Sequence, residues 1–266
     1  MSVKTKAQEI AERQAELNAR LADTLTEKGV EADASETTTA LIAKVGEIEQ
    51  GGARQALEFW ARNCDISGRL NGPDIKGEVG DLSFDNASSL QNVFQNSVVT
   101  KIGNITAPYA TTINSGFSNA RNLEHVGLID APDLTSVYQI FYNAVSLKTF
   151  GGFTGDKIKT WGTMCYGTRA LETIEHPLNL AIATSISTMF HDCSALRDVR
   201  FVAESIRISL SIGASSVLSS ESVQSIVDGL ADLTGGTTQT LTLHKNVAVS
   251  DEQKAAITLK NWTLVQ

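Results

Sequence analysis

The fold is decided by four stretches that repeat one short phrase: FSNARNLEHV at 117–126, FYNAVSLKTF at 141–150, CYGTRALETI at 165–174 and FHDCSALRDV at 190–199. Each phrase has an apolar first residue, a turn-forming residue two positions later, Leu six positions later and an apolar residue nine positions later. The shared leucines, Leu123, Leu147, Leu171 and Leu196, are 24, 24 and 25 residues apart. Such a period indicates stacked units that bury a core only between neighbours, so a solenoid is predicted.

A degenerate copy of the phrase lies one period upstream, at Phe94, Val99 and Ile102. With this copy the array has about five units, over residues 90–202. The Leu-x-x-apolar step predicts a short strand, and apolar pairs such as Ile113 and Phe117 predict one helical or 3₁₀ turn before it. The predicted corner is the position two after the leading residue, where every residue type tolerates a left-handed or tight-turn backbone: Asn96, Asn119, Asn143, Gly167 and Asp192.

These units resemble the leucine-rich repeats of the surface-protein type found in bacterial adhesins and phage tail proteins, whose unit has a leading Phe, a small turn residue and a Leu-x-x-Val strand. The resemblance covers about five units, less than half of the chain, and Cys165 departs from it by replacing the Phe. It implies an α+β fold: a short leucine-rich-repeat-like solenoid of about five 24-residue units, with a helical, coiled-coil-like segment before it and an α/β cap after it. It also implies repeats that present a surface and perform no chemistry of their own.

Residues 1–52 are predicted to be a helical attachment and oligomerisation segment. A short heptad seam runs from Val3 to Thr24, with Ile10, Leu17 and Leu21 as its oligomerisation contacts. A free helix of two to three heptads is only marginally stable. We therefore expect a homo-oligomer, with a trimer favoured, or binding to other tail proteins. The stretch 21–48 also resembles a helix, break and helix module of phage minor tail and baseplate proteins. The alternative is an amphipathic hairpin that packs on the first repeat.

The two ends of the array are predicted to be closed. Residues 53–89 are interpreted as a strand-rich lead-in, and residues 203–266 as a C-terminal cap. The cap is predicted to contain a helix at 219–233, a strand in TTQTLTLHKNV, a helix opened by a Ser250 and Gln253 capping box, and a strand at Trp262. This order resembles the tail end of repeat proteins encoded by phages and prophages.

Composition narrows the function classes. The 266 residues carry a net charge of −8 with a pI near 5.1, which argues against binding to nucleic acid or to an anionic membrane. No apolar stretch is long enough to cross a membrane, and the N-terminal MSVKTKAQEIAERQ lacks the apolar core of a secretory signal. We therefore expect no membrane insertion, and synthesis in a cytoplasm. The resemblance to phage tail proteins implies that the chain is assembled there into a virion tail.

No catalytic, cofactor or metal site is predicted. The four histidines, His125, His176, His191 and His244, lie at unrelated repeat positions without metal-ligand spacing. Cys165 and Cys193 fall where other units have Phe and Ala, so both are interpreted as buried thiols. Cys64 makes the number of cysteines odd. Glu172 and Glu175 are interpreted as part of a solvated face rather than as a glycosidase pair.

One row of residues is a candidate binding surface. The positions directly after the leading residue include Ser118, Tyr142, Tyr166 and His191, which would stack on one ridge about 5 Å apart. Side chains of this kind in a row suit the docking of a host-surface glycan or protein. The alternative is that these are ordinary corner residues whose rings lean on one another.

The function expected from these features is that of a non-enzymatic structural protein of a phage tail, in a baseplate or tail fibre. It would attach through its N-terminal helices and display the repeats for recognition of a host surface. Two alternatives stay open: a purely structural tail component that binds no receptor, and a bacterial leucine-rich-repeat adhesin. The adhesin should carry an export signal and a wall or lipid anchor.

Overall fold

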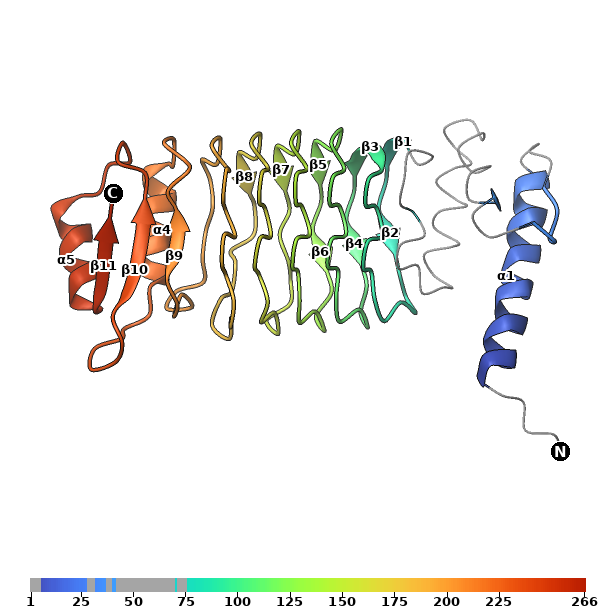
Figure 1. Ribbon diagram of the computed structural model, residues 1–266, viewed down its shortest axis with the longest axis horizontal. Coiled ribbons are helices and arrows are strands. Elements are labelled where there is room, and N and C mark those ends of the chain that lie inside the picture. Colours follow the sequence, from blue (N-terminus) through green and yellow to red (C-terminus); the bar gives the residue numbers. More distant parts are fainter. Residues whose placement is uncertain (1–5, 28–31, 37–39, 42–69, 71–75) are drawn as a thin grey trace.

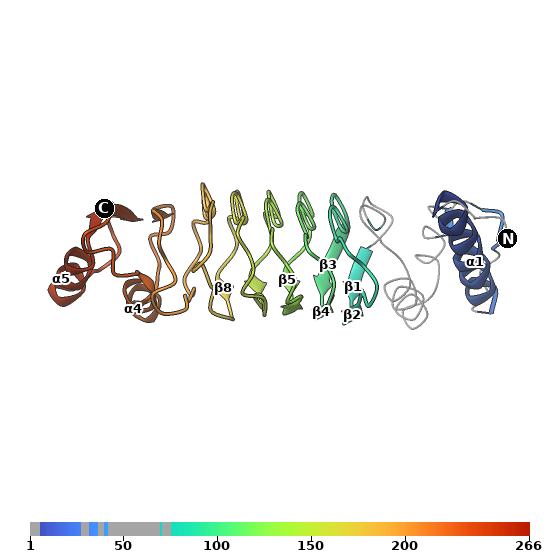
Figure 2. The same ribbon diagram turned by 90° about the horizontal axis from the view of Figure 1, so that it is seen from below.

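The chain folds as a parallel β-solenoid of about 8 turns, with a repeat of ~24 residues. The computed structural model describes residues 6–27, 32–36, 40, 41, 70 and 76–266, with side chains from residue 12 onward. Figure 1 shows the coils side by side along the long axis of the molecule, and Figure 2 shows each coil as a narrow loop. The predicted solenoid is confirmed.

Three parallel sheets run along the solenoid. The largest contains β1 (Lys76–Val79), β3 (Val98–Ile102), β5 (His125–Val126), β7 (Thr149–Phe150) and β8 (Thr173–Ile174). The second contains β2 (Leu82–Ser83), β4 (Ile105–Thr106) and β6 (Ile129–Asp130). The third contains β9 (Leu210–Ile212), β10 (Gln239–Leu243) and β11 (Trp262–Val265). Because His125 pairs with Thr149 and Thr149 with Thr173, equivalent residues of successive coils are direct neighbours.

The array is longer than the five units predicted for residues 90–202. Upstream, β1 and β2 pair in parallel with β3 and β4, so residues 76–83 of the lead-in already belong to the coils. Downstream, β9, β10 and β11 also pair in parallel, with α4 (Ser220–Gly229) and α5 (Asp251–Leu259) as the crossovers between them. These outer coils escaped the repeat count because the backbone register continues there, whereas the Phe and Leu phrase does not.

The prediction of a helical or 3₁₀ turn in each coil is wrong, because the backbone groups that a helix would use are bonded to the next coil. Ser115, Phe117 and Asn119 donate their N–H groups to carbonyls of the following coil at 2.9, 2.8 and 2.7 Å. The intervening Gly116 and Ser118 donate to carbonyls three residues back. The segment is thus a run of successive turns, and α-helices are found only outside the repeat phrases in the described part of the chain.

The predicted corners are confirmed. Asn119, Asn143, Gly167 and Asp192 all have left-handed backbones, with φ of 57°, 56°, 76° and 62°. Asn, Asp and Gly are the residue types that reach this region at least cost. A second left-handed position, which the phrase did not reveal, lies four residues earlier in each of the same coils: Ser115, Gln139, Thr163 and Thr188. This spacing of four keeps Ile113 and Phe117 on the buried side, which explains the helix-like periodicity in the sequence.

The core is built from columns of identical repeat positions. The leading residues are all buried, and three of them stack: Phe94 on Phe117 with ring centres 5.6 Å apart, and Phe117 on Phe141 at 5.3 Å. In the next coil the leading residue shrinks to Cys165, whereas the residue four positions before it grows from Ile or Val to Trp161. Close-packed interiors tolerate such volume-conserving exchanges. The Cys165 departure from the pattern is therefore compensated within its own coil.

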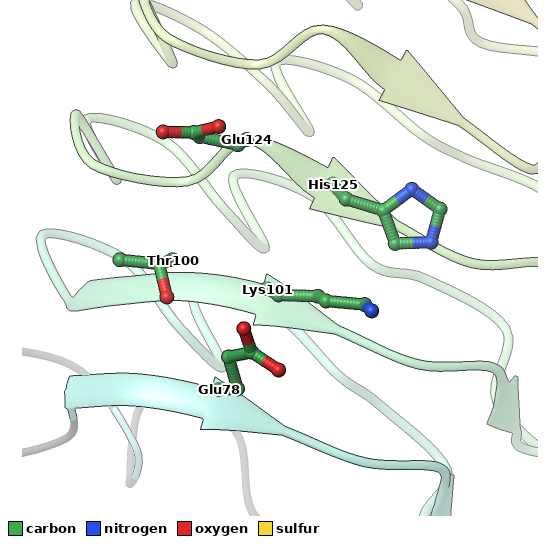
Figure 3. Close-up of a pocket in the computed structure, with 5 residues that line it drawn as sticks. All are labelled: Glu78, Thr100, Lys101, Glu124 and His125. Carbon is green, nitrogen blue, oxygen red and sulfur yellow. The ribbon is translucent and has the colours of Figure 1, made fainter.

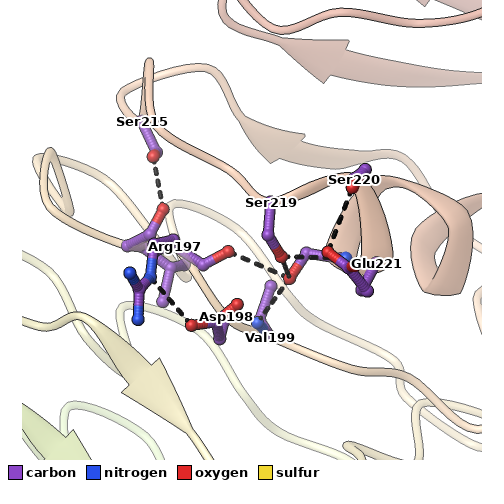
Figure 4. A network of polar contacts seen from close by, with 9 residues as sticks. Arg197, Asp198, Val199, Ser215, Ser219, Ser220 and Glu221 are labelled. Atoms are coloured by element: carbon purple, nitrogen blue, oxygen red, sulfur yellow. Dashed lines mark hydrogen bonds and ion pairs between the residues drawn. The ribbon is translucent and has the colours of Figure 1, made fainter.

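The helix α4 covers the edge of the largest sheet. Figure 4 shows the polar contacts at this junction. Ser222, which is buried, accepts a hydrogen bond from the Val199 N–H at 2.9 Å and donates to the Arg197 carbonyl at 3.0 Å. Ser225 likewise accepts from the Phe201 N–H at 3.0 Å. These hydroxyls take the place of the next strand, so the sheet edge is not left to pair with other chains.

The predicted cap elements are also found. The predicted apolar face of α4 is buried at Val223, Ile226 and Val227, and Ser219 is its N-cap. The capping box at Ser250 and Gln253 opens α5. Trp262 in β11 is buried, and its Nε1 donates to the Ala231 carbonyl at 2.9 Å.

Phe141→Ala should reduce the free energy of unfolding by about 3–5 kcal/mol, the range for a buried aromatic residue that leaves a cavity. Phe141 is fully buried between the Phe117 stack and the edge of Phe150. Urea denaturation followed by circular dichroism measures the effect. The control is Val145→Ala on the exposed side of the same coil, which should cost below ~0.5 kcal/mol. Equal losses in the two variants would contradict the packing described.

Ser222→Ala should destabilise the protein by roughly 1–3 kcal/mol, because it leaves the buried Val199 N–H without a partner, whereas the Arg197 carbonyl keeps the Ser219 N–H at 2.9 Å. The matched control is Ser220→Ala, whose hydroxyl bonds only the exposed Glu221 carboxylate. Its effect should stay within ~0.5 kcal/mol in the same urea titration. A Ser222 variant as stable as the control would show that α4 does not satisfy the sheet edge.

Candidate binding site

The row predicted from the sequence forms a stack of rings on the surface. Tyr142 and Tyr166 lie with ring centres 5.2 Å apart and an interplanar angle of 19°. Tyr166 and His191 lie 4.6 Å apart and are nearly parallel, at 5°. The stack follows from the register, since the three residues precede the left-handed corner in consecutive coils and strands lie about 4.8 Å apart. Tyr142, Tyr166 and His191 are hereafter called the ring stack.

Ser118 occupies the same row but differs from the other three. It is buried and carries no ring, so the ring stack begins one coil later than the predicted ridge. The stack therefore spans three coils. A small residue at Ser118 leaves the outer face of Tyr142 without an aromatic neighbour in its row.

Charged side chains flank the last ring. The Asp192 carboxylate lies 3.3 Å from Nδ1 of His191 and 3.7 Å from Nη2 of Arg169. All three side chains are partly exposed, so the contact between Arg169 and Asp192 is a surface ion pair that solvent screens. The left-handed φ of Asp192 turns the chain directly after His191. The carboxylate is thus held beside the ring by the corner itself.

A pocket of about 360 Å³ lies at the His191 end of the ring stack. One side comes from the last repeat phrase and the residue two before it: Thr188, Phe190, His191 and Asp192. The other side comes from the end of β9 and the turn after it: Ser211, Gly213 and Ala214. The sequence did not indicate this pocket, because its second wall lies outside the repeat phrase. The available signal was the end of the phrase at residue 199, after which no ring continues the row.

A second depression lies on the outer face of the largest sheet. It has a volume of about 440 Å³ and is lined by Glu78, Thr100, Lys101, Glu124 and His125 (Figure 3). Beside it, Nζ of Lys148 lies 2.7 Å from Oε2 of Glu124. The hydrogen bond to this carboxylate and its negative charge raise the pKa of Lys148. His125 Nδ1 lies 2.6 Å from Thr149 Oγ1. Glu124 and His125 thus pair with residues of the next strand along the sheet, which is the arrangement of a solvated charged face.

The other candidate chemical groups are placed in structural roles. Cys165 and Cys193 are buried, as predicted, and Cys64 lies outside the described residues. Burial raises the pKa of Cys193 to about 12, and that of Cys165 also rises well above its ordinary value. Among the described residues, no group of three His, Cys, Asp or Glu side chains could hold a metal ion. Glu172 and Glu175 are both exposed.

The predicted oligomerisation contacts lie on α1 (Lys6–Glu27). Leu17 and Leu21 are buried within the single chain, in the same apolar cluster as Leu41. Asn18 Nδ2 donates to the Glu36 carbonyl at 3.2 Å, which ties the helix to the segment after it. The side chain of Ile10 lies outside the described residues. A seam between chains through Leu17 and Leu21 would require both side chains to leave this intrachain contact.

No protein-family model matches the chain, and neither the curated proteins nor the solved structures contain a match to it. Across the parts of the chain that the structure describes, no helix combines the length and the apolar character needed to span a membrane.

Cys165 and Cys193 should resist alkylation in the native protein, because burial keeps both thiols protonated at neutral pH. In a Cys64→Ser background, iodoacetamide at pH 8 should label neither thiol in the native chain and both in guanidinium chloride, as counted by intact mass. Rapid labelling of either native thiol would contradict the described core.

Proposed function

We propose that the chain is a non-enzymatic recognition protein of a phage tail, which binds a host surface through its ring stack. One observation carries the proposal: three rings, Tyr142, Tyr166 and His191, are held in parallel on the outside of a solenoid. Aromatic side chains in fixed positions supply contact area at low entropic cost, and they dominate the energetics of many interfaces.

The scaffold favours such a role because it fixes the rings before any ligand arrives. The Asn119, Asn143 and Gly167 N–H groups bond the next coil at 2.7, 2.8 and 2.9 Å, directly beside the row. A ring attached to this ladder loses little further freedom on binding, and preorganisation of this kind raises affinity.

The phage context rests on sequence resemblance. The repeat phrases are similar to surface-protein-type leucine-rich repeats, and both ends of the chain are similar to segments of phage tail and baseplate proteins. In this proposal the N-terminal helices attach the chain to other tail proteins, and the chain acts as a homo-oligomer, with a trimer favoured. Because Leu17 and Leu21 are covered within one chain, attachment would use the polar side of α1, which carries Glu16 and Arg20.

Two alternative functions make different predictions. A purely structural tail component would pack its coils against other tail proteins and would not need exposed rings. A bacterial surface adhesin would use the same ring stack but would be found on the cell that makes it. The ring stack favours recognition over a purely structural role, and the resemblance of both chain ends favours the virion over the adhesin.

Two localisation and binding measurements test the proposal with the full-length chain. An antibody against residues 203–266 should label tails of phage particles from the strain that encodes the chain. The labelled chain should also adsorb to host cells, and Tyr166→Ala should weaken adsorption by at least ~10-fold, as expected for a central interface aromatic. The control is Tyr109→Ala, which removes an exposed tyrosine outside the row.

Each outcome decides between the functions. Tail labelling with equal adsorption of wild type and Tyr166→Ala would support the purely structural role. Labelling of the producing cell surface, with none on particles, would support the adhesin.

A further inference from the structure

At the pocket at the end of the ring stack, the last ring of the stack borders a cavity. Tyr166 is covered on both faces, by Tyr142 and by His191. His191 is covered on one face by Tyr166, and it also lines the pocket of about 360 Å³. The coil beyond it contributes only small residues to the pocket, namely Ser211, Gly213 and Ala214. The cavity between His191 and these small residues therefore leaves room for a further group beside the last ring of the stack.

The lining of the pocket selects the chemistry of its occupant. A flat imidazole offers a stacking surface, the Asp192 carboxylate offers hydrogen-bond acceptors only, and Ser211 offers a hydroxyl. Asp192 is the only lining residue with a permanent charge, and its ion-pair partner Arg169 is not part of the lining, so the lining offers no cation to a phosphate or carboxylate ligand. A bare aromatic side chain would add no donor to this carboxylate, whose present neighbours are Nδ1 of His191 and Nη2 of Arg169. A neutral ring with C–H bonds on one face and hydroxyl donors at its edge satisfies all three groups.

We propose that this pocket binds a single neutral pyranose unit of a saccharide, with its C–H face against His191 and its hydroxyls on Asp192 and Ser211. The inference names the ligand class of the recognition function proposed above and rests on it. The ring stack then acts as a support that holds His191 in place, and Tyr142 and Tyr166 lie outside the pocket lining.

Titration of the full chain with methyl glycosides of neutral hexoses and N-acetylhexosamines tests the proposal, followed by saturation-transfer and chemical-shift NMR. At least one glycoside should bind saturably in the millimolar range, as expected for one sugar ring. His191→Ala, which removes the stacking face, and Ala214→Leu, which fills the pocket from its other wall, should each weaken binding by at least ~10-fold. Asp192→Asn keeps a residue suited to the left-handed corner and should weaken binding by about 10-fold through loss of the charged acceptor.

Tyr109→Ala serves as the matched control and should bind the glycoside within twofold of wild type, since Tyr109 is outside the row and the pocket. Thermal melting of each variant shows whether it is folded. Ala214→Leu and His191→Ala change different walls of the pocket, so if one variant does not fold, the other still tests the proposal. Absence of saturable binding by wild type, or equal affinity of wild type and folded Ala214→Leu, would overturn the proposal.

Cell adsorption separates this proposal from the function on which it rests. If Tyr166→Ala loses adsorption whereas folded Ala214→Leu does not, the recognition function stands and the pocket proposal falls. If glycosides bind in the pocket but no variant changes adsorption, the pocket proposal stands and the recognition function falls.

Discussion

The structure depends on one constraint, the hydrogen bonding of each coil to the next at a fixed offset of about 24 residues. The Phe117 N–H donates to the Ile140 carbonyl, and the Phe141 N–H donates to the Met164 carbonyl. Because this offset is kept, every residue lies beside its equivalents in the neighbouring coils. Side chains are thereby sorted into columns. An inward column must hold shapes that stack or interdigitate, as Phe94, Phe117 and Phe141 do. An outward column becomes a row of identical spacing, and the ring stack is one such row.

The same constraint creates open ends, and the chain closes one of them by a specific device. At the C-terminal edge of the largest sheet, hydroxyls of α4 take the hydrogen bonds that a further strand would have taken. In a separate sheet, parallel pairing continues through β9, β10 and β11, with α4 and α5 as the crossovers. The candidate pocket lies where this change begins. The pocket exists because His191 is the last ring of the row, and the following coil has small residues there in place of a further ring.

Much of the fold could be predicted from the sequence because the repeat imposes itself on residue types. The amino-acid types alone reveal the buried leucine column from Leu123 to Leu196. They also reveal the left-handed corners at Asn119 and Asp192. The capping box at Ser250 is similarly local. The turn before each phrase was mispredicted, because left-handed residues four apart imitate the period of a helix. The left-handed φ values and the hydrogen bonds to the neighbouring coil distinguish the two structures.

In the candidate site, too, some features could be predicted from the sequence and others depend on the neighbouring coil. Three members of the row were predictable, since they share one position in consecutive phrases. The buried state of Ser118 and the pocket wall at Gly213 and Ala214 were not, because both depend on the course of a neighbouring coil. The burial of Leu21 within one chain likewise depends on a contact that the heptad pattern cannot distinguish from a contact between chains.

The most direct measurement is a crystal structure of the full chain with a bound methyl glycoside that saturates it in solution. The account predicts a pyranose ring lying parallel to the His191 imidazole, with hydroxyls in hydrogen-bond distance of Asp192 and Ser211. A glycoside bound away from the ring stack, or a pocket that stays without sugar while another site is occupied, would contradict it.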